Sequence, residues 1–407
     1  MINVAAAFSW RLLYPRFFYS SYSTMSSLLK TKLPRVGTTI FTAMSALAQT
    51  HGALNLSQGF PDFSPPLRLA EALGEHALRG HNQYAPMAGL PRLRETIARQ
   101  LLLHRDVVVD PDTEVTVVPG ATESIFCAIT AVVRPGDEVI VLDPVYDSYE
   151  PAIELAGGRA VHVPLLTGSF GIDWELVSKA ITPRTRLFML NSPHNPCGSI
   201  VSNADLDVLA SLAEQHGFLV CSDEVYEHLV YDGHKHCSVL AHPVLRSRSF
   251  AHFSFGKTLS VTGWKTGYCV APPELTAELR KIHQYVTFVA VTPVQHALAD
   301  FLDAEPEYPA TLAADYQRRR DLFLSKLAGS RFSWKPTQGS YFQLLDYGQI
   351  SDDSDTVLSE RWTREVRVAS VPVSVFYESP PKQSILRFCF AKSDEVLIEA
   401  AERLCAI

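Results

Sequence analysis

The sequence has 407 residues, of which 47% are hydrophobic and 19% are charged, as is typical of a globular protein with a large core and one or two domains. Its formal net charge of −7 is spread along the chain without a basic block, which argues against nucleic acid as a partner. No apolar run reaches the roughly 18 residues of a membrane-spanning helix, so we expect no membrane partner either.

The first 61 residues contain no aspartate or glutamate, and Arg11 and Arg16 lie there among Ser, Tyr and Phe. This is the composition of a mitochondrial transit peptide. An upstream start codon, with Met25 as the true start, explains the same composition, and we adopt this second interpretation. We therefore expect residues 1–29 to be an N-terminal extension and the protein to be cytoplasmic, or mitochondrial if residues 1–24 are a transit peptide.

Two helices are predicted next, over residues 65–80 and 91–104, because apolar side chains recur there at helical spacing. From residue 115 to 271 short β-rich runs then alternate with helical patterns such as residues 202–217. The predicted strands are 115–118, 138–142, 159–163, 186–190, 218–222, 249–254 and 267–271. Nearly all-apolar strands that alternate with helices predict an α/β fold with a mostly parallel sheet covered on both faces.

The pattern changes after about residue 300. A long polar helix over 305–328 precedes two strands, "SYFQLL" and "ILRFCFA", with helices between them. We expect a small α+β domain made of residues 30–60 and 301–407, and a large cofactor-binding domain over 61–300.

The stretch "SFGKTLSVTGWKTG" (254–267) contains Gly-Lys-Thr, the end of a nucleotide-binding P-loop. A P-loop requires a glycine at position 251, where this chain has Ala251. No two glycines lie two residues apart, so the dinucleotide fingerprint G-x-G-x-x-G is absent as well. Both common nucleotide signatures therefore fail, and a P-loop ATP- or GTP-binding protein is disfavoured.

Chemically useful side chains nevertheless follow successive predicted strands. Ligands bind beyond the carboxyl ends of strands in an open parallel sheet. Gly120, Ala121 and Thr122 form a turn and a helix start suited to phosphate, and Tyr146 offers a ring for stacking. Asn195 supplies an amide, and Asp223 and Tyr226 supply a carboxylate and a phenol. Ser254 and Lys257 supply a hydroxyl and an amine. Any one of these residues has an ordinary structural explanation, but their joint appearance does not.

A flat phosphorylated cofactor that joins a lysine and pairs its ring nitrogen with a carboxylate is pyridoxal 5′-phosphate (PLP). We expect this cofactor and no metal. The segment "HKHC" (234–237) offers soft ligands without a spaced second pair, so a solvated loop is the expected structure. The seven cysteines never form a C-x-x-C pair, which indicates free thiols in a reducing compartment.

From about residue 30 to 407 the chain resembles the class I aminotransferases of fold type I. It is most similar to bacterial methionine aminotransferases and to the kynurenine aminotransferase (glutamine transaminase K) group. The matching motifs are "KLPRVGTTIFTAMSALA", "NLSQGFPDF", "NQYAPMAG", "NSPHNPCG", "SDEVYEH", "SFGKTLSVTGWKTGY" and "LRFCFAK".

The resemblance implies roles for the residues around the cofactor. Lys257 matches the Schiff-base lysine, which also carries the proton at the substrate Cα, and Asp223 matches the partner of the ring nitrogen. Further cofactor contacts fall on Gly120, Ala121, Thr122, Tyr146, Asn195, Tyr226, Ser254 and Lys265. Tyr84 matches a phosphate ligand that comes from the neighbouring subunit, so the resemblance also implies a homodimer with shared active sites.

It also implies substrate contacts. Arg387 matches the arginine that grips the substrate α-carboxylate, since a planar guanidinium suits a carboxylate bidentately. Gly59 and Asn195 match further contacts, and Phe288 lies in "YVTFVAVTP" (285–293), which borders the side-chain pocket in this family. Since that segment has no Lys or Arg, a dicarboxylate substrate is not expected.

We thus expect a PLP-dependent aminotransferase that moves an amino group from methionine, aromatic or other neutral amino acids to a 2-oxo acid by a ping-pong mechanism. A kynurenine–oxoglutarate transaminase or cysteine-S-conjugate β-lyase on the same scaffold is the alternative. A non-catalytic PLP-binding protein is a third possibility, which the complete lysine, carboxylate and arginine set disfavours.

Overall fold

The structure is a computed structural model that describes residues 30–407, and the expected N-terminal extension over 1–29 lies outside the described residues. Residues Gly37–Ile407 form one unit, and the fold given below is that of this unit.

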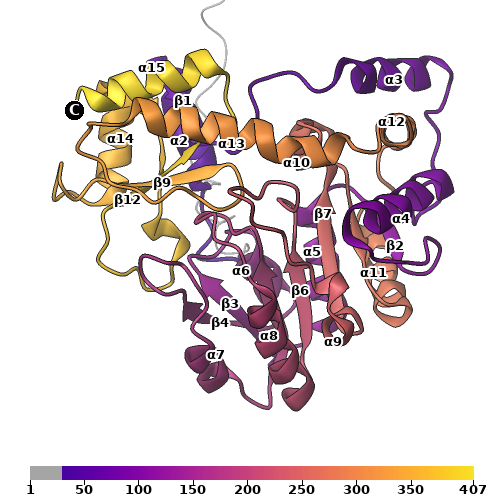
Figure 1. The fold of residues 1–407 in the computed structure, drawn as a ribbon. Coiled ribbons are helices and arrows are strands. Elements are labelled where there is room, and N and C mark those ends of the chain that lie inside the picture. The colour runs from indigo at the N-terminus through magenta and orange to yellow at the C-terminus, as the bar shows by residue number, and fades with distance from the viewer. Residues whose placement is uncertain (1–29) are drawn as a thin grey trace, which may run out of the picture. The chain divides into compact units, whose positions relative to one another are not determined.

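The large sheet has seven strands in the order β2-β8-β7-β6-β5-β3-β4 (Figure 1). Their bounds are β2 Val115–Val118, β3 Glu138–Asp143, β4 Arg159–Pro164, β5 Thr185–Asn191, β6 Leu219–Asp223, β7 Ser249–Ser254 and β8 Gly267–Val270. The strands expected between 115 and 271 are all confirmed to within one residue at each end.

The sheet departs from a purely parallel arrangement at one strand. Neighbouring strands from β4 to β7 pair in parallel, whereas β8 is antiparallel to both β7 and β2. A parallel connection needs a crossover of a dozen or more residues, usually through a helix that packs on the sheet. The segment between β7 and β8 holds only the single turn α10 (Phe255–Thr258) and a 3₁₀ turn (Thr262–Trp264), so the chain returns antiparallel.

Alternate side chains of the strands enter two separate hydrophobic cores, one on each face of the sheet. In β3, for example, Ile140 and Leu142 enter one core while Val139 and Val141 enter the other. The first core is completed by α3 Leu67–Leu78, α4 Pro91–Arg105, α7 Trp174–Ala180, α8 Asn203–His216, α9 Pro243–Arg246 and α12 Thr292–Ala304. The second is completed by α5 Ala121–Val132, α6 Tyr149–Leu155 and α11 Pro273–Val286. The expectation of a sheet covered on both faces is confirmed.

A third core belongs mainly to the C-terminal part of the chain. Its three-stranded antiparallel sheet has the order β11-β12-β9, with β9 Phe342–Asp346, β11 Val371–Pro372 and β12 Ile385–Cys389. A short parallel pair joins β1 Leu54–Asn55 to β10 Val368–Ala369. The helices that belong with these strands are α2 Ile40–His51, from the N-terminal side, and α13 Tyr308–Lys326, α14 Asp355–Glu365 and α15 Asp394–Cys405. Figure 1 shows α13 and α15, in orange and yellow, side by side over β9 and β12.

The long helix and both strands expected after residue 300 are therefore present. The expected domain boundaries, at residues 60 and 300, stay a prediction. None of the helices in the described part of the chain is long and apolar enough to span a membrane.

Gly267, at the start of β8, has no room for a side chain. A Cβ at this position would lie 2.3 Å from the Phe253 carbonyl oxygen and 3.4 Å from the Gly120 Cα, and these are backbone atoms that cannot rotate away. We predict that Gly267→Ala lowers the free energy of unfolding by about 1–3 kcal/mol, the usual range for overpacking, measured by urea denaturation. Gly263→Ala is the matched control, because a Cβ there meets nothing within 4 Å. Equal stability of the two variants would contradict the prediction.

Candidate active site

One pocket of about 260 Å³ lies at the carboxyl-end edge of the large sheet, against β9 and β12 of the C-terminal sheet. Nearly all of the residues expected to form the site line it: Gly59, Gly120, Ala121, Thr122, Tyr146, Asn195, Asp223, Tyr226, Ser254, Lys257, Lys265 and Arg387. The chain thus brings together side chains that are up to about 330 residues apart in sequence, as in the hydrogen bond between Arg387 and Ser57.

One end of the pocket is built to hold an anion. Gly120 has φ 85°, a left-handed conformation that favours glycine, and it leads directly into α5. No side chain caps this helix N-terminus, so its first N–H groups face the pocket without an internal partner. The Lys265 ammonium lies against the same turn, since a Cβ on Gly120 would be 3.3 Å from Lys265 Nζ. Amide donors and an ammonium at a helix N-terminus together form a phosphate site.

The antiparallel return of β8 explains why Lys265 reaches this turn. Gly267 is in register with Ser254 of β7 and with Val118 of β2, so the residues next to these strand ends meet at one edge. Ser254 and Lys265 therefore line the same pocket as the α5 N-terminus although they are 11 positions apart in sequence.

Asp223, at the end of β6, supplies a buried carboxylate. It is 5% exposed and accepts a hydrogen bond of 2.5 Å from the Tyr149 hydroxyl, and it forms no ion pair within the described residues. Burial raises the pKa of Asp223 to about 6, against the hydrogen bonds from Tyr149 and Val225, which lower it. A carboxylate that is buried in a pocket wall without an ion-pair contact fits a protonated heterocyclic nitrogen.

Lys257 lies in the pocket wall just after β7. Its Nζ donates to the Tyr341 hydroxyl at 2.7 Å and to the Gly59 carbonyl at 3.3 Å, and Tyr341 in turn donates to the same carbonyl at 2.6 Å. Burial lowers the pKa of Lys257 to about 8, although the nearby Asp223 charge raises it. About a tenth of a lysine with this pKa is deprotonated at pH 7, far more than of an ordinary lysine, so it is a competent nucleophile and base.

Arg387, in β12, is the most unusual charged residue of the site. Its side chain is fully buried, its Nη atoms donate to Asn195 Oδ1 and to the Ser57 carbonyl at 2.7 Å each, and its Nε has no partner. The guanidinium stacks on Phe342 at 3.9 Å and forms no ion pair within residues 30–407. Burial lowers the pKa of Arg387, but an arginine stays charged in a protein. The site therefore contains an uncompensated cation with a free N–H.

Aromatic and amide groups complete the pocket wall. Because Asn195 Oδ1 accepts from Arg387, its amide NH₂ is left as the donor that the site can use. The Tyr226 ring is buried and packs edge-on to Tyr341 at 5.0 Å, and burial raises the pKa of its hydroxyl well above the ordinary value. Burial also raises the pKa of Tyr146 to about 12, so both phenols remain hydrogen-bond donors at neutral pH.

Several residues of the site were not expected from the sequence. They are Phe41, Gln58, Asn191, Tyr149, Tyr341 and Phe342. Asn191 Nδ2 donates to the Asp223 carbonyl and Asn191 Oδ1 accepts from the Asn195 amide, so this residue joins the two strand ends. Asn191 directly precedes the "SPHNPCG" turn, and this position at a strand end was a usable signal. Tyr149 and Tyr341 act through contacts across the fold, for which the sequence carries no local pattern.

Two expected site residues lie elsewhere. Tyr84 is 83% exposed and Phe288 is 40% exposed, and their rings contact each other edge-on at 5.5 Å. Neither lines the pocket of its own chain. Their roles in the site stay predictions that involve a second subunit.

The "HKHC" segment is only partly the solvated loop that was expected. His234 and Lys235 are exposed, but the side chain of His236 is 3% exposed and pairs with Glu224 Oε2 at 2.7 Å. That part of the expectation was wrong, because a buried glutamate in the core draws the histidine inward.

The family profile described as aminotransferase class I and II matches residues 52–404. The chain belongs to this aminotransferase family. It is 49% identical to the methionine aminotransferase of Escherichia coli (strain K12) over 92% of this chain and 97% of that protein. The crystal structure of YbdL from Escherichia coli, described as having a methionine aminotransferase function, gives a TM-score of 0.91 at 48% identity and covers 93% of this chain and 99% of that chain.

More distant relatives have other named substrates. The structure of N-succinyldiaminopimelate aminotransferase from Mycobacterium tuberculosis gives a TM-score of 0.89 at 38% identity, covering 93% of this aminotransferase and 99% of that chain. Human kynurenine–oxoglutarate transaminase 1 is 34% identical over 88% of this chain and 93% of that protein. The expected family and fold type are thereby confirmed.

The lowered pKa of Lys257 yields a test that needs no substrate. In cofactor-free protein, we predict that acylation of Lys257 by an amine-reactive reagent is half-maximal near pH 8, instead of near the ordinary lysine value of about 10.4. The labelled peptide is quantified by mass spectrometry. Asp223→Asn should move the midpoint to lower pH, because the Asp223 charge raises the pKa of Lys257. A midpoint near 10.4 in the folded protein would refute the argument.

Proposed function

We propose that this aminotransferase binds PLP in the pocket and transfers the amino group of methionine, or of an aromatic or other neutral amino acid, to a 2-oxo acid by a ping-pong mechanism. The observation that carries the proposal is Arg387, a fully buried guanidinium whose Nε is unpartnered and which forms no ion pair within residues 30–407. A buried charge without a counter-ion is costly, so the pocket favours a ligand that brings a carboxylate.

The pocket residues fit the cofactor at each of its polar groups. The α5 N-terminus, Ser254 and Lys265 would hold the phosphate, and Asp223 would face the ring nitrogen. The Asn195 amide and the Tyr226 hydroxyl would donate to the phenolic oxygen, and the Tyr146 ring would stack on the pyridine. Bound PLP would supply an aldehyde that joins an amine and a ring that accepts electron density from the substrate Cα.

The chain's own residues would then divide the work. Arg387 would bind the α-carboxylate through its Nε–H and the second N–H of an Nη atom, which its hydrogen bonds to Asn195 and Ser57 leave over, and so fix the position of Cα. Lys257 Nζ would take the proton from the substrate Cα as a base and deliver it to the cofactor carbon as an acid. Its pKa of about 8 suits both proton transfers. Tyr341 and the Gly59 carbonyl would orient that amine through their hydrogen bonds to it.

Two observations support a neutral substrate side chain. The cationic side chains among the described residues that line the pocket are Lys257, Lys265 and Arg387, and each has a role above. Within residues 30–407 of one chain, the pocket has no further cation left for a distal carboxylate. Phe41 and Phe342 add apolar surface, which suits a thioether or a ring. The 49% identity to a methionine aminotransferase favours methionine over kynurenine, whose named transaminase is 34% identical.

We predict that methionine and phenylalanine convert the PLP-loaded enzyme to its amine form with kcat/KM at least about 100-fold above that of aspartate. Seating a distal carboxylate without a cation costs several kcal/mol, and each 1.4 kcal/mol is a factor of about ten. The half-reaction is followed by the loss of cofactor absorbance after mixing with a single amino acid. A panel led by aspartate would overturn the specificity but leave the aminotransferase family unchanged. Pyruvate release from a cysteine conjugate would measure the β-lyase alternative.

Two lysine variants serve as controls for this panel. Lys257→Ala should slow the half-reaction by at least about 100-fold while cofactor stays bound, because it removes the proton carrier. Lys265→Ala should chiefly weaken cofactor retention, since it removes a phosphate contact. The reverse pattern would refute the assignment of the two lysines.

We further propose a homodimer in which Tyr84 of one chain reaches the phosphate bound in the other. Tyr84 and Phe288 form an exposed aromatic pair that does not line the pocket of its own chain, as the proposed assembly requires. Segment 83–85 is anchored by Thr292, whose hydroxyl donates to the Gln83 carbonyl at 2.7 Å and accepts from the Ala85 amide at 3.1 Å.

We predict that Tyr84→Phe weakens PLP retention about 10- to 100-fold, as expected for one lost hydrogen bond to a charged group. Retention is measured by equilibrium dialysis, and subunit mass by sedimentation. Tyr308→Phe is the control, because this half-buried tyrosine of α13 neither lines the pocket nor lies in segment 285–293. A monomer that retains PLP and turns over would exclude the shared site.

A further inference from the structure

Three histidines lie together well away from the pocket, between α3, α12 and the loop that follows α3. His76 is in the last turn of α3, His81 follows a turn at Gly80, and His296 is in α12. The backbone places His81 next to His76 through a hydrogen bond from the His81 amide to the His76 carbonyl. We refer to His76, His81 and His296 as the histidine cluster. None of them lines the PLP pocket.

The ring nitrogens of the histidine cluster converge on one point. His76 Nδ1 and His81 Nδ1 are 2.8 Å apart, and one nitrogen from each of the three rings lies within 4.8 Å of the others. The rings stack with centroids 4.3 to 5.0 Å apart. In the hydrogen bond between His76 and His81 one Nδ1 donates and the other accepts, so at least one ring of this pair presents a lone pair to the point where the rings meet.

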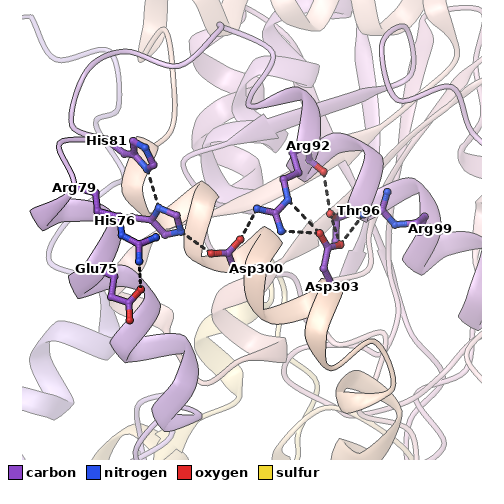
Figure 2. Close-up of polar contacts among 9 residues, drawn as sticks. All are labelled: Glu75, His76, Arg79, His81, Arg92, Thr96, Arg99, Asp300 and Asp303. Carbon is purple, nitrogen blue, oxygen red and sulfur yellow. Dashed lines mark hydrogen bonds and ion pairs between the residues drawn. The ribbon is translucent and has the colours of Figure 1, made fainter.

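A carboxylate fixes which nitrogen of His76 carries the proton. Asp300 Oδ2 lies 2.7 Å from His76 Nε2, so this nitrogen donates and Nδ1 presents its lone pair to His81. Arg92 donates hydrogen bonds to both Asp300 and Asp303. Asp303 also accepts from Thr96 and Arg99 (Figure 2). Figure 2 shows this chain running from His81 through His76 to α4, so the imidazole is oriented from behind by a braced carboxylate.

A histidine that donates one N–H to a carboxylate and offers its other nitrogen is the arrangement typical of a metal ligand. We propose that His76, His81 and His296 bind one divalent transition-metal ion of the Zn²⁺ type, with Asp300 as the outer carboxylate. Imidazole is a preferred ligand of such ions, whereas Mg²⁺ and Ca²⁺ prefer oxygen.

The distances between the ring nitrogens allow one ion to bind all three histidines after small side-chain movements. Two nitrogens bound to a tetrahedral Zn²⁺ at roughly 2.0–2.1 Å lie about 3.4 Å apart. The 2.8 Å between His76 and His81 would have to open by about half an ångström, and His296, whose nitrogen lies within 4.8 Å of the others, would have to approach by up to about 1.4 Å. His81 and His296 are half-exposed, so an ion can enter and a water can fill the fourth position.

A second group of possible ligands does not support a metal site. Glu123, Cys127 and His283 also lie within 4.8 Å of one another. There, however, Glu123 Oε1 accepts from both Cys127 and His283, and burial raises the pKa of the Cys127 thiol far above the ordinary value. A thiol that stays protonated is not a metal ligand. At the histidine cluster, by contrast, a change of tautomer that moves the His81 proton from Nδ1 to Nε2 supplies the lone pair that a metal needs.

An ion at the histidine cluster would join the end of α3 and residue 81 to α12. The segment 83–85 is already anchored to α12 through Thr292, so the metal would brace the start of the loop that carries Tyr84. The proposal itself rests only on the cluster and not on the function of the PLP pocket.

The test is a Zn²⁺ titration of tag-free, PLP-loaded protein after removal of metals with a chelator, measured by calorimetry. We expect one equivalent per chain, with affinity reduced at least about tenfold in His81→Ala and in His296→Ala. Asp300→Asn should reduce affinity by about 10- to 100-fold, as removal of an outer partner does. These residues are preferred over His76, whose burial makes its replacement a risk to folding.

His216→Ala is the matched control, because His216 is an exposed histidine at the end of α8 and outside the cluster. Its Zn²⁺ affinity should equal that of the unaltered protein. Co²⁺ gives a second readout, since a tetrahedral histidine site produces visible absorption that His296→Ala should abolish. Absence of binding, or equal affinity in His81→Ala, His296→Ala and His216→Ala, would overturn the proposal. Melting temperatures of the metal-free variants separate lost binding from lost structure.

Discussion

The site depends on a positive charge that is held inside the protein and forms no ion pair within the described residues. Arg387 is fully buried, and the groups that contact it are neutral: an amide oxygen, a backbone carbonyl and the faces of aromatic rings. Each contact stabilises the guanidinium partially, and none neutralises it. The cost must be offset by the rest of the fold, and the extensive hydrophobic cores on both faces of the large sheet and around the small sheet can do this.

The same principle extends to the carboxylate and the ammonium of the pocket. Asp223 is buried without an ion pair, and burial moves the pKa values of Asp223 and Lys257 toward each other, to about 6 and about 8. Both groups would be more stable in water. Unfavourable burial of several charges around one cavity is typical of a functional site, where a ligand supplies the missing partners.

The position of these groups follows from how strand ends meet. Because β8 runs antiparallel, the residue before it lies at the same edge as the residues after β2 and β7. Lys265 therefore lies at the α5 N-terminus, and the missing side chain of Gly267 allows the backbones to approach closely. Arg387 comes from β12 of the three-stranded sheet, whereas Lys265 lies just before β8 of the large sheet. The two cations at the two ends of the pocket are therefore held by separate hydrophobic cores.

The sequence by itself determined the elements and most of the site. Apolar runs and helical periodicity located the seven strands of the large sheet, because the strands other than the edge strand β4 are almost wholly buried and each helix buries one side. Motif residues at successive strand ends located the pocket, since the ends of parallel strands share an edge. Only the tertiary structure decided the direction of β8, the roles of Tyr149, Tyr341 and Phe342, and the convergence of the histidine cluster. These features arise from contacts between side chains far apart in the chain, and local propensity and periodicity carry no record of which distant residues will meet.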